Sequence, residues 1–458
     1  MKIIVMKGTC TLVASWILST VVAVAEPSAT DGGLDKKFNK TGQLSIGAPA
    51  GEELLASDLE LQADGKIVVL AQRWKPSVPN VASDVYLARI RSDGSFDASF
   101  DGDGRLISDP FQGLELPRAM ALQKDGKIVV AGVVQNAPTN LNLIDGFIAR
   151  YLSSGAPDAS FGGGAGAIRV DLEVLDELQD VVVQADGKIV VAGFATGLDG
   201  QSRLVLARFK PNGQPDLPFG GANAGFVQTL LNGGGANAFR LVLQKDRKIL
   251  VAGHTGSFLS PTGLEPIVAR FLSSGRLDLA FGGGDGFVLV RDPLVDPLFR
   301  EVASDVAVLS NGSILVSGGR AAADSRSGSW AVHRLDSSGV PDASFGSHGL
   351  VRVELNASYE GGVGLLPVGG GRLVLYGGSN AGLAPGFPAS RSSLARLNLN
   401  GTLDPSFGSG GKASFPLSPQ GSGFVAVALQ KDGLLVALSA VHLQDSSRLV
   451  VSRHLAKP

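Results

Sequence analysis

Residues 61–71 read LQADGKIVVLA, and the phrase returns as LQKDGKIVVAG at 122–132, VQADGKIVVAG at 183–193 and LQKDRKILVAG at 243–253. Three less similar copies follow: LSNGSILVSGG at 309–319, PVGGGRLVLYGG at 367–378 and LQKDGLLVALSA at 429–440. The turn position, Asp64 in the first copy, recurs at intervals of 59 to 65 residues. An Asp-Gly pair between two apolar runs is the strongest short-range signal of a β-hairpin. The chain is therefore expected to repeat one hairpin along its length.

A second phrase follows each of the first six copies, for example LARIRSDGSFDASF at 87–100 and IARYLSSGAPDASFG at 148–162. In every copy an Asp stands eight residues after an Arg, although the segments around this phrase vary in length. A constant offset predicts a rigid turn, in which the arginine fork can bind a carboxylate and turn carbonyls together. We therefore interpret these residues as structural pairs. They are Arg89 and Asp97, Arg150 and Asp158, Arg208 and Asp216, Arg270 and Asp278, Arg334 and Asp342, and Arg396 and Asp404.

Each unit predicts four short antiparallel strands: two in the hairpin, one around the LAR triplet and one after the SFGxxG corner. Four strands in about 60 residues, repeated without helical periodicity, are typical of a β-propeller blade. A two-layer sandwich would not explain such similar repeats, and a β-solenoid would need much shorter coils. The predicted fold is all-β.

The two ends of the chain carry complementary parts of one unit. The seventh copy has only its third strand after it, so Arg453 has no downstream Asp, whereas residues 31–46 hold Asp35 and Phe38 followed by a strand. We predict a seven-bladed propeller with four-stranded blades and a 3+1 closure, in which 31–46 complete the C-terminal blade at 424–458. This closure would remove free sheet edges, and it predicts that Asp35 pairs with Arg453.

The two phrases together resemble the delta-60 repeat, a bacterial family of units of roughly 60 residues assigned to β-propellers. The resemblance covers essentially all of residues 26–458. Copies five and six depart from the pattern in the first phrase, and the fourth copy has Arg247 where Gly is expected. The resemblance implies an exported or surface-associated bacterial propeller. It implies no activity, cofactor or catalytic residue.

The first 25 residues have the features of a signal peptide. Lys2 and Lys7 precede an apolar stretch that ends in Ala-Val-Ala at 23–25, a pattern that signal peptidase accepts. We expect one propeller domain at 26–458, located in the periplasm, on the cell surface or outside the cell. No later stretch is long and apolar enough to span a membrane. The single cysteine, Cys10, lies in the signal, so the exported chain would be free of disulfides.

Composition excludes several classes of protein. The 458 residues include 62 Gly without a collagen period, and only 18% are charged, so the chain is neither collagen nor disordered. The formal net charge of -2 gives no electrostatic reason to bind nucleic acid. We expect a monomer whose partner is a protein or a glycan.

The local motifs predict no cofactor and no metal. The glycine run at 408–413 lacks the Ser or Thr of a phosphate loop and occupies the corner found in every repeat. Asp101 and Asp103 hint at a calcium loop, but the equivalent turns lack alternating oxygen ligands. The five His residues have no ligand spacing, and no nucleophile elbow is present. No catalytic residue is predicted, although a site assembled from several blades remains possible.

The variable segments are expected on one face of the propeller, because the nearly invariant turns alternate with them along the chain. Aromatic residues there suit the recognition of a glycan or a protein, together with acidic residues near the inner strands. The candidate binding residues are Trp74, Phe111, Glu115, Asp176, Phe258, Phe299, Glu301, Tyr359, Glu360 and Phe387. The favoured hypothesis is a non-catalytic binding or scaffold module. The alternative is an extracytoplasmic hydrolase or lyase with its site at the mouth of the channel.

Overall fold

The computed structural model describes residues 31–75, 82–135, 144–221, 224–256, 264–291, 300–321, 328–355, 359–380, 390–443 and 446–456. The predicted signal peptide at 1–25 lies outside these residues. Among the described residues no helix has the length and apolar character needed to cross a membrane.

The repeat forms four antiparallel strands, as in β2 (Glu53–Leu61), β3 (Ile67–Lys75), β4 (Ala82–Ile90) and β5 (Arg105–Ser108). Each strand pairs with the next one in sequence, from β2 with β3 to β4 with β5. The turn from β2 to β3 is the Asp-Gly turn of the first phrase, where Gly65 has a φ of 86° that favours glycine. The sequence phrase therefore encodes one complete sheet.

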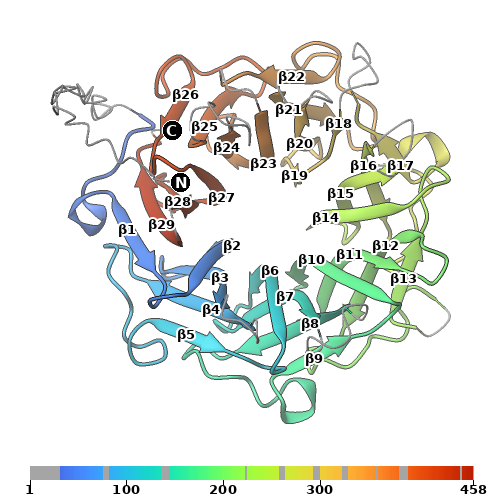
Figure 1. Cartoon of the computed structure of the whole chain (residues 1–458). Coiled ribbons are helices and arrows are strands. Elements are labelled where there is room, and N and C mark those ends of the chain that lie inside the picture. The colour runs from blue at the N-terminus through green and yellow to red at the C-terminus, as the bar shows by residue number, and fades with distance from the viewer. Residues whose placement is uncertain are drawn as a thin grey trace, which may run out of the picture.

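The same order of strands is found along the rest of the chain. The next four-stranded units contain β6 (Leu114–Leu122), β7 (Ile128–Gln135), β8 (Ile144–Tyr151) and β9 (Ala167–Val170), then β10 (Leu175–Val183), β11 (Ile189–Thr196), β12 (Ser202–Phe209) and β13 (Phe226–Thr229), then β14 (Ala236–Leu243), β15 (Ile249–Gly256), β16 (Leu264–Phe271) and β17 (Phe287–Leu289). One parallel pair, Ser83 with Leu114, links β4 to β6, and another, Leu175 with Ile144, links β10 to β8, so the first three units are continuous. They are followed by β18 (Arg300–Glu301), β19 (Asp305–Val308), β20 (Ile314–Ala321), β21 (Gly328–Leu335) and β22 (Leu350–Val353), and by β23 (Tyr359–Val368), β24 (Arg372–Asn380), β25 (Arg391–Asn398) and β26 (Lys412–Phe415). Figure 1 shows these sheets arranged around a common axis, with β2, β6, β10, β14, β19, β23 and β27 innermost. The architecture is an all-β propeller.

The last sheet combines both ends of the chain. Strands β27 (Ser422–Leu429), β28 (Leu435–His442) and β29 (Ser447–His454) come from the C-terminal region, and β1 (Gln43–Gly47) pairs antiparallel with β29. The register places Gln43 opposite Ser452 and Gly47 opposite Arg448. In Figure 1 the N-terminal strand lies beside the C-terminal strands. The hydrophobic cluster that contains Ile46 also takes side chains from β2, β3, β4 and β27 to β29, so the first and last sheets share a core.

Apolar side chains fill the spaces between neighbouring sheets. The Phe at the end of each second phrase is fully buried, and so is its N-terminal counterpart. These residues are Phe38, Phe100, Phe161, Phe219, Phe281, Phe345 and Phe407. Burial of an aromatic side chain of this size contributes about 2 to 3 kcal/mol to folding. The repeated Phe is therefore core and does not present a stacking surface to a ligand.

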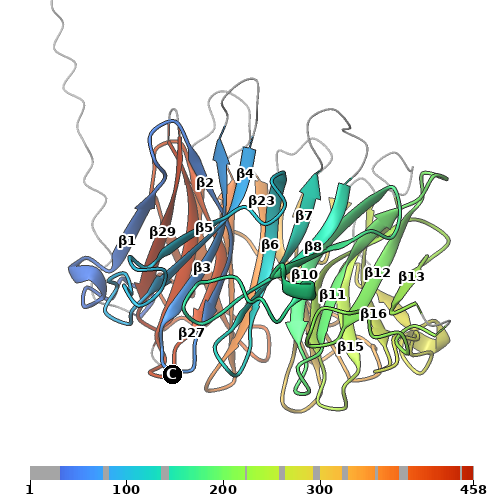
Figure 2. The same ribbon diagram turned by 90° about the horizontal axis from the view of Figure 1, so that it is seen from below.

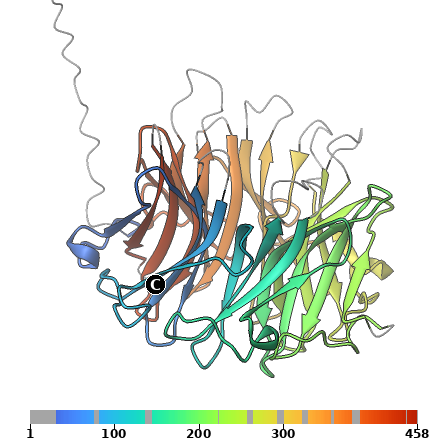
Figure 3. The same cartoon turned by 60° about the horizontal axis from the view of Figure 1, so that its bottom comes forward.

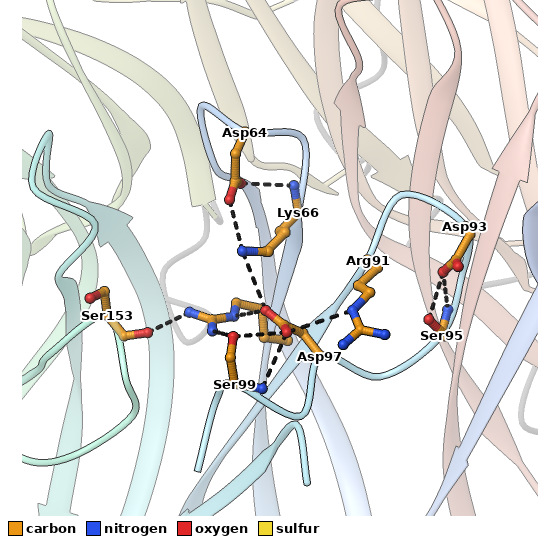
Figure 4. A network of polar contacts seen from close by, with 9 residues as sticks. Asp64, Lys66, Arg91, Asp93, Ser95, Asp97, Ser99 and Ser153 are labelled. Carbon is orange, nitrogen blue, oxygen red and sulfur yellow. Dashed lines mark hydrogen bonds and ion pairs between the residues drawn. The ribbon is translucent and has the colours of Figure 1, made fainter. Parts of the chain in front are cut away.

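Arg89 binds side chains of its own turn and a carbonyl of the adjacent sheet. Figure 4 shows the partners Asp97, Ser99 and Ser153 in their polar network. Arg89 Nε donates to Asp97 Oδ2 at 2.8 Å, its Nη2 donates to Ser99 Oγ at 2.9 Å, and its Nη1 donates to the carbonyl of Ser153 in the next repeat. The guanidinium also lies 4.9 Å above the ring of Phe100. One side chain thus fixes its own turn and the neighbouring sheet.

The equivalent arginines reach forward in the same way. Arg150, Arg208, Arg270 and Arg334 each donate to a carbonyl of the following repeat, and Arg453 donates to the carbonyl of Ser92 at 2.6 Å. Ser92 belongs to the first repeat, so this contact joins the last sheet to the first. Arg396 forms a 2.6 Å ion pair with Asp31, which lies in the N-terminal segment.

Candidate functional site

The two ends of the strands form two different faces, seen from the side in Figures 2 and 3. The turn face carries the turn from the first to the second strand and the turn from the third to the fourth. The variable-loop face carries the links from the second to the third strand and from the fourth strand to the next sheet. On the turn face the recurring Arg, Asp and Ser side chains bind one another and the adjacent sheet. The variable-loop face is therefore the better candidate for ligand contact.

Three carboxylates from two sheets meet on the variable-loop face. Asp84 begins β4, Asp109 follows β5 and Glu115 lies in β6, and each offers an oxygen within 4.8 Å of the others. We call these residues the first carboxylate cluster. Glu115 is completely buried, and its Oε1 accepts the backbone amides of Phe111 and Gly113 at 3.2 and 3.3 Å. Its Oε2 has no hydrogen-bond partner among the described residues.

Basic side chains compensate part of the charge of the first cluster. Asp84 Oδ2 lies 3.0 Å from Arg73 Nη1 and 2.9 Å from Lys75 Nζ, and Arg73 also binds Glu52. Glu115 has no such partner. Burial, together with the nearby charge of Asp109, raises the pKa of Glu115 to about 7. This carboxyl group can therefore exchange a proton near neutral pH.

A second carboxylate cluster lies one sheet further along. It contains Asp145 at the start of β8, Asp171 after β9 and Asp176 in β10, again with oxygens within 4.8 Å of one another. Asp176 is 1% exposed, and its Oδ2 accepts the amides of Leu172 and Glu173 at 2.6 and 3.1 Å. Its Oδ1 has no hydrogen-bond partner within the described part of the chain. The second cluster thus repeats the geometry of the first.

Phe111 connects the two clusters. Its amide donates to Glu115, its ring lies edge-on to Phe147 at 5.8 Å, and the guanidinium of Arg169 lies 4.8 Å above it. Arg169 in turn forms a 3.1 Å ion pair with Asp145. The ring is half-buried, as is that of Trp74 in β3. Both rings are therefore partly accessible to a ligand.

The remaining candidates divide into those that the structure describes and those that it does not. Glu301 lies in β18 and is buried. Tyr359 and Glu360 lie in β23, but their side chains are outside the described residues. Phe258, Phe299 and Phe387 are also outside the described residues. Of the ten candidates, the structure therefore brings together Phe111 and Glu115, and places Asp176 in the neighbouring cluster.

A second group of ionisable side chains lines the central channel, and sequence reasoning missed it. Asp58, Asp180 and Asp305 occupy the same position of their repeats, six residues before the turn residue, where β2 and β10 each have a bulge. Arg240 occupies this position in β14, with its Nε 3.3 Å from Asp305 and its Nη1 3.7 Å from Asp180. An alignment of the repeats would have revealed these positions, because four repeats have a charged residue where the other repeats have Ala or Gly.

Each channel aspartate holds two backbone amides. Asp58 accepts the amide of Leu59 at 2.8 Å and that of Met120, in the next repeat, at 2.9 Å. Asp180 and Asp305 likewise bind their own next amide and one amide of the following sheet. These carboxylates therefore join neighbouring sheets, as the arginines do on the turn face.

The channel also contains a cavity of about 330 Å³ lined by Asp58, Arg240, Asp305 and Tyr376, among others. Next to Asp58, burial and the charge of that carboxylate raise the pKa of Glu60 to about 8. Burial raises the pKa of Asp180 to about 6, against the opposing effect of Arg240. Carboxyl groups with raised pKa beside a cavity can transfer protons, so the channel is a second candidate region.

Sequence comparison agrees with the fold. Five segments match a family model described as "Domain of unknown function (DUF5122) beta-propeller": residues 62–100, 123–161, 184–219, 244–281 and 387–407. Each matched segment ends at the buried Phe of its repeat. No curated protein matches the chain.

Three solved structures with low sequence identity are similar to this chain over most of its length. Polysaccharide lyase Uly1 has a TM-score of 0.48 and 10% identity, over 90% of this chain and 99% of that chain. The β-propeller domain of the Trilobed protease from Pyrococcus furiosus has a TM-score of 0.43 and 9% identity, over 89% and 96%. The α-L-arabinanase of Penicillium chrysogenum has a TM-score of 0.44 and 13% identity, over 91% and 98%.

Proposed function

We propose that the chain is an exported bacterial binding module, a single seven-bladed propeller at 26–458 of the delta-60 repeat type with a 3+1 closure. The pairing of β1 with β29 supports the closure, and the contact of Arg453 with the carbonyl of Ser92 supports a continuous ring. The signal-like sequence at 1–25 supports export to the periplasm, the cell surface or the medium. Its ligand contacts the variable-loop face, and the module acts as a monomer.

The distribution of repeated residues between the two faces carries this proposal. On the turn face, the charged side chains that recur in each unit are occupied by contacts within the protein, as for Arg150 with Asp158 and Ser160. On the variable-loop face, residues differ between repeats, and Glu115 and Asp176 keep carboxylate oxygens without a hydrogen-bond partner among the described residues. A rigid scaffold on one face with variation on the other is the usual way to mount a binding site.

The ligand we favour is a glycan, with a protein as the other candidate. Carboxylates accept hydrogen bonds from sugar hydroxyls, and half-buried aromatic rings such as those of Trp74 and Phe111 can pack against the apolar side of a sugar. The net charge of -2 argues against a strongly anionic polymer. A neutral glycan is therefore the first ligand to test.

The test combines a glycan array with a pull-down from envelope extract. We expect the chain to retain a glycan and the Trp74→Ala variant to lose at least about tenfold in affinity, as the loss of a buried aromatic contact does. The control is Lys124→Ala, an exposed substitution on the turn face, which should bind like the unmodified chain. Retention of a protein alone would replace the glycan by a protein partner. Equal binding by both variants, or no retained ligand, would refute a site on this face.

The channel supports an enzyme as the second candidate. Glu60, with a pKa of about 8, is protonated at pH 7 and could act as a general acid two residues along β2 from Asp58, which lines the cavity with Arg240. The reaction class would be hydrolysis or elimination on a glycan. The assay measures release of reducing ends and of unsaturated sugars from a panel of polysaccharides. Activity that Glu60→Gln abolishes, and Trp74→Ala leaves intact, would favour this candidate over a pure binding module.

A further inference from the structure

The positions of the carboxylate clusters recur at the junctions between sheets, and the residues found there can be compared. Three sequence positions meet at each junction. The first is five residues before the repeated Arg, the second directly follows or lies near the end of the fourth strand, and the third is ten residues before the next turn position. At the junction of β8, β9 and β10 these are Asp145, Asp171 and Asp176. Like the junction that holds the first cluster, this junction therefore has three acidic groups at these positions, which the remaining junctions fill differently.

Where one acidic group is replaced by a basic one, an ion pair forms. At the junction of β16, β17 and β18 the three positions hold Glu265, Arg291 and Glu301. Arg291 stands where the second cluster has Asp171, and its Nη1 lies 2.9 Å from Glu265. At the junction after β12 the same positions hold Arg203, Leu230 and Ala236, without any carboxylate. At the junction of β16, β17 and β18, Arg291 thus compensates part of the negative charge of the acidic residues.

The second cluster holds more negative charge than its own basic neighbour compensates. Arg169 donates to Asp145 Oδ2 at 3.1 Å, and its side chain is 30% exposed. Asp176 is 1% exposed and receives two backbone amides on Oδ2, whereas its Oδ1 has no partner among the described residues. A buried carboxylate oxygen without a partner costs about 1 to 3 kcal/mol. A bound cation would remove this cost.

We propose that Asp145, Asp171 and Asp176 bind a divalent cation, with calcium as the best match. All three ligands are carboxylate oxygens, which hard cations prefer, and no His or Cys belongs to the set. Calcium accepts six to eight oxygen ligands in flexible geometry, so water can supply the remainder. The cation would join β8 and β9 of one sheet to β10 of the next. This site does not depend on the proposed function of the variable-loop face.

The first cluster provides an internal comparison. There Lys75 Nζ and Arg73 Nη1 lie 2.9 and 3.0 Å from Asp84 Oδ2, where they compete directly with a metal ion for that oxygen. Asp109 has the same place in the first cluster as Asp171 has in the second, and both residues are exposed. We therefore expect calcium to bind at the second cluster and not at the first.

The test measures calcium binding by isothermal titration with the chain after removal of metal by a chelator. We expect one bound calcium per chain and a melting temperature that rises with calcium concentration, because a ligand bound only to the folded state stabilises it. Asp171→Asn should weaken calcium binding at least about tenfold, since it removes a charged ligand. The matched substitution Asp109→Asn at the first cluster should change the affinity less than about twofold.

Both substitutions replace exposed residues, so the variants are expected to fold, and circular dichroism verifies this. The absence of calcium binding at millimolar concentration would overturn the proposal. Equal weakening by Asp171→Asn and Asp109→Asn, or no weakening by Asp171→Asn, would overturn it as well. A conservative Asp171→Glu variant that recovers binding would support the site.

Discussion

Arg453 Nε donates to Asp35 Oδ2 at 2.9 Å, although 418 residues separate the two in the sequence. A backbone hydrogen bond joins the same two residues, since the amide of Asp35 donates to the carbonyl of Arg453 at 2.8 Å. The guanidinium lies 5.2 Å from the centre of the Phe38 ring, as the other repeated arginines lie above theirs. The N-terminal segment thus supplies to the last sheet the Asp and Phe that every other sheet takes from its own turn.

Loss of this pair should destabilise the whole protein. Asp35→Ala leaves Arg453 buried without its carboxylate, so we expect the free energy of unfolding to fall by about 3 kcal/mol. Arg453→Ala should have a similar effect. In a double-mutant cycle followed by chemical denaturation, the two substitutions should show a coupling of about 1 to 3 kcal/mol. Additive effects would mean that the ends of the chain are held together by other contacts.

The repeated arginines should act as structural groups inside the ring as well. Arg150 is 4% exposed and binds Asp158, Ser160 and the carbonyl of Pro211. We expect Arg150→Ala to lower the free energy of unfolding by about 3 kcal/mol. The exposed Lys124→Ala should change it by less than about 0.5 kcal/mol. Equal melting temperatures for the two variants would contradict the structural role of the arginine.

Arg247 occupies a turn position that favours glycine. Its φ is 68°, and the equivalent Gly65, Gly126 and Gly187 have φ values of 86°, 83° and 82°. A left-handed backbone costs an L-residue about 1 to 2 kcal/mol, partly offset by the larger entropy of unfolded glycine. Arg247→Gly should therefore raise the free energy of unfolding by about 0.5 to 1 kcal/mol.

The reverse substitution tests the same reasoning. A Cβ added at Gly65 would meet no atom within 4 Å, so Gly65→Ala changes the backbone strain without a steric clash. We expect it to lower the melting temperature while Arg247→Gly raises it. The reasoning requires the melting temperature to change in opposite directions in the two variants. Changes in the same direction would refute backbone strain at this turn.

The raised pKa of Glu115 predicts a dependence of stability on pH. Its pKa is about 7 in the folded chain against an ordinary value of 4.5, so the protonated form is stabilised by folding. This contribution is fully present below about pH 4.5 and is lost as the pH rises through about 7. Glu115→Gln keeps the acceptor for the amides of Phe111 and Gly113 and cannot ionise.

Thermal melting at two pH values measures this effect. We expect Glu115→Gln to be more stable than the unmodified chain at pH 8, by up to about 3 kcal/mol, and nearly equal to it at pH 4.5. The nearby groups Asp84, Asp109, Arg73 and Lys75 are the same in both proteins, so the comparison reports on the change at position 115. A difference between the two proteins that does not vary with pH would exclude ionisation of Glu115 as its cause.

Much of the fold can be predicted from the sequence because the repeat encodes local structure. The Asp-Gly turns, the alternating apolar strands and the constant spacing of Arg and Asp each depend on residues close together in the chain. The contact of Arg89 with Asp97 at 2.8 Å is an example, since eight residues separate the pair. The departure at Arg247 is also visible in the sequence, and its positive φ shows that the turn keeps its shape.

The candidate site could be predicted only in part. Glu115 and Asp176 attract attention as acidic residues in variable segments, but their buried environment depends on the packing of the neighbouring sheet. Their partners Asp84, Asp109, Asp145 and Asp171 were not singled out, because each cluster combines residues of two strands with one residue of the link between sheets. The channel residues Asp58, Asp180 and Asp305 were missed for a related reason: their partners are backbone amides of the next sheet.

The sequence alone determined the repeated four-stranded unit, because hairpin turns, strand alternation and the turn networks are local and recur with the repeat. Only the tertiary structure decided which carboxylates meet and which of them remain uncompensated. Contacts between sheets depend on atoms far away in sequence, as where Asp58 accepts the amide of Met120, 62 residues further along the chain. Those atoms belong to segments that differ between repeats, so the repeat pattern does not predict which of them meet.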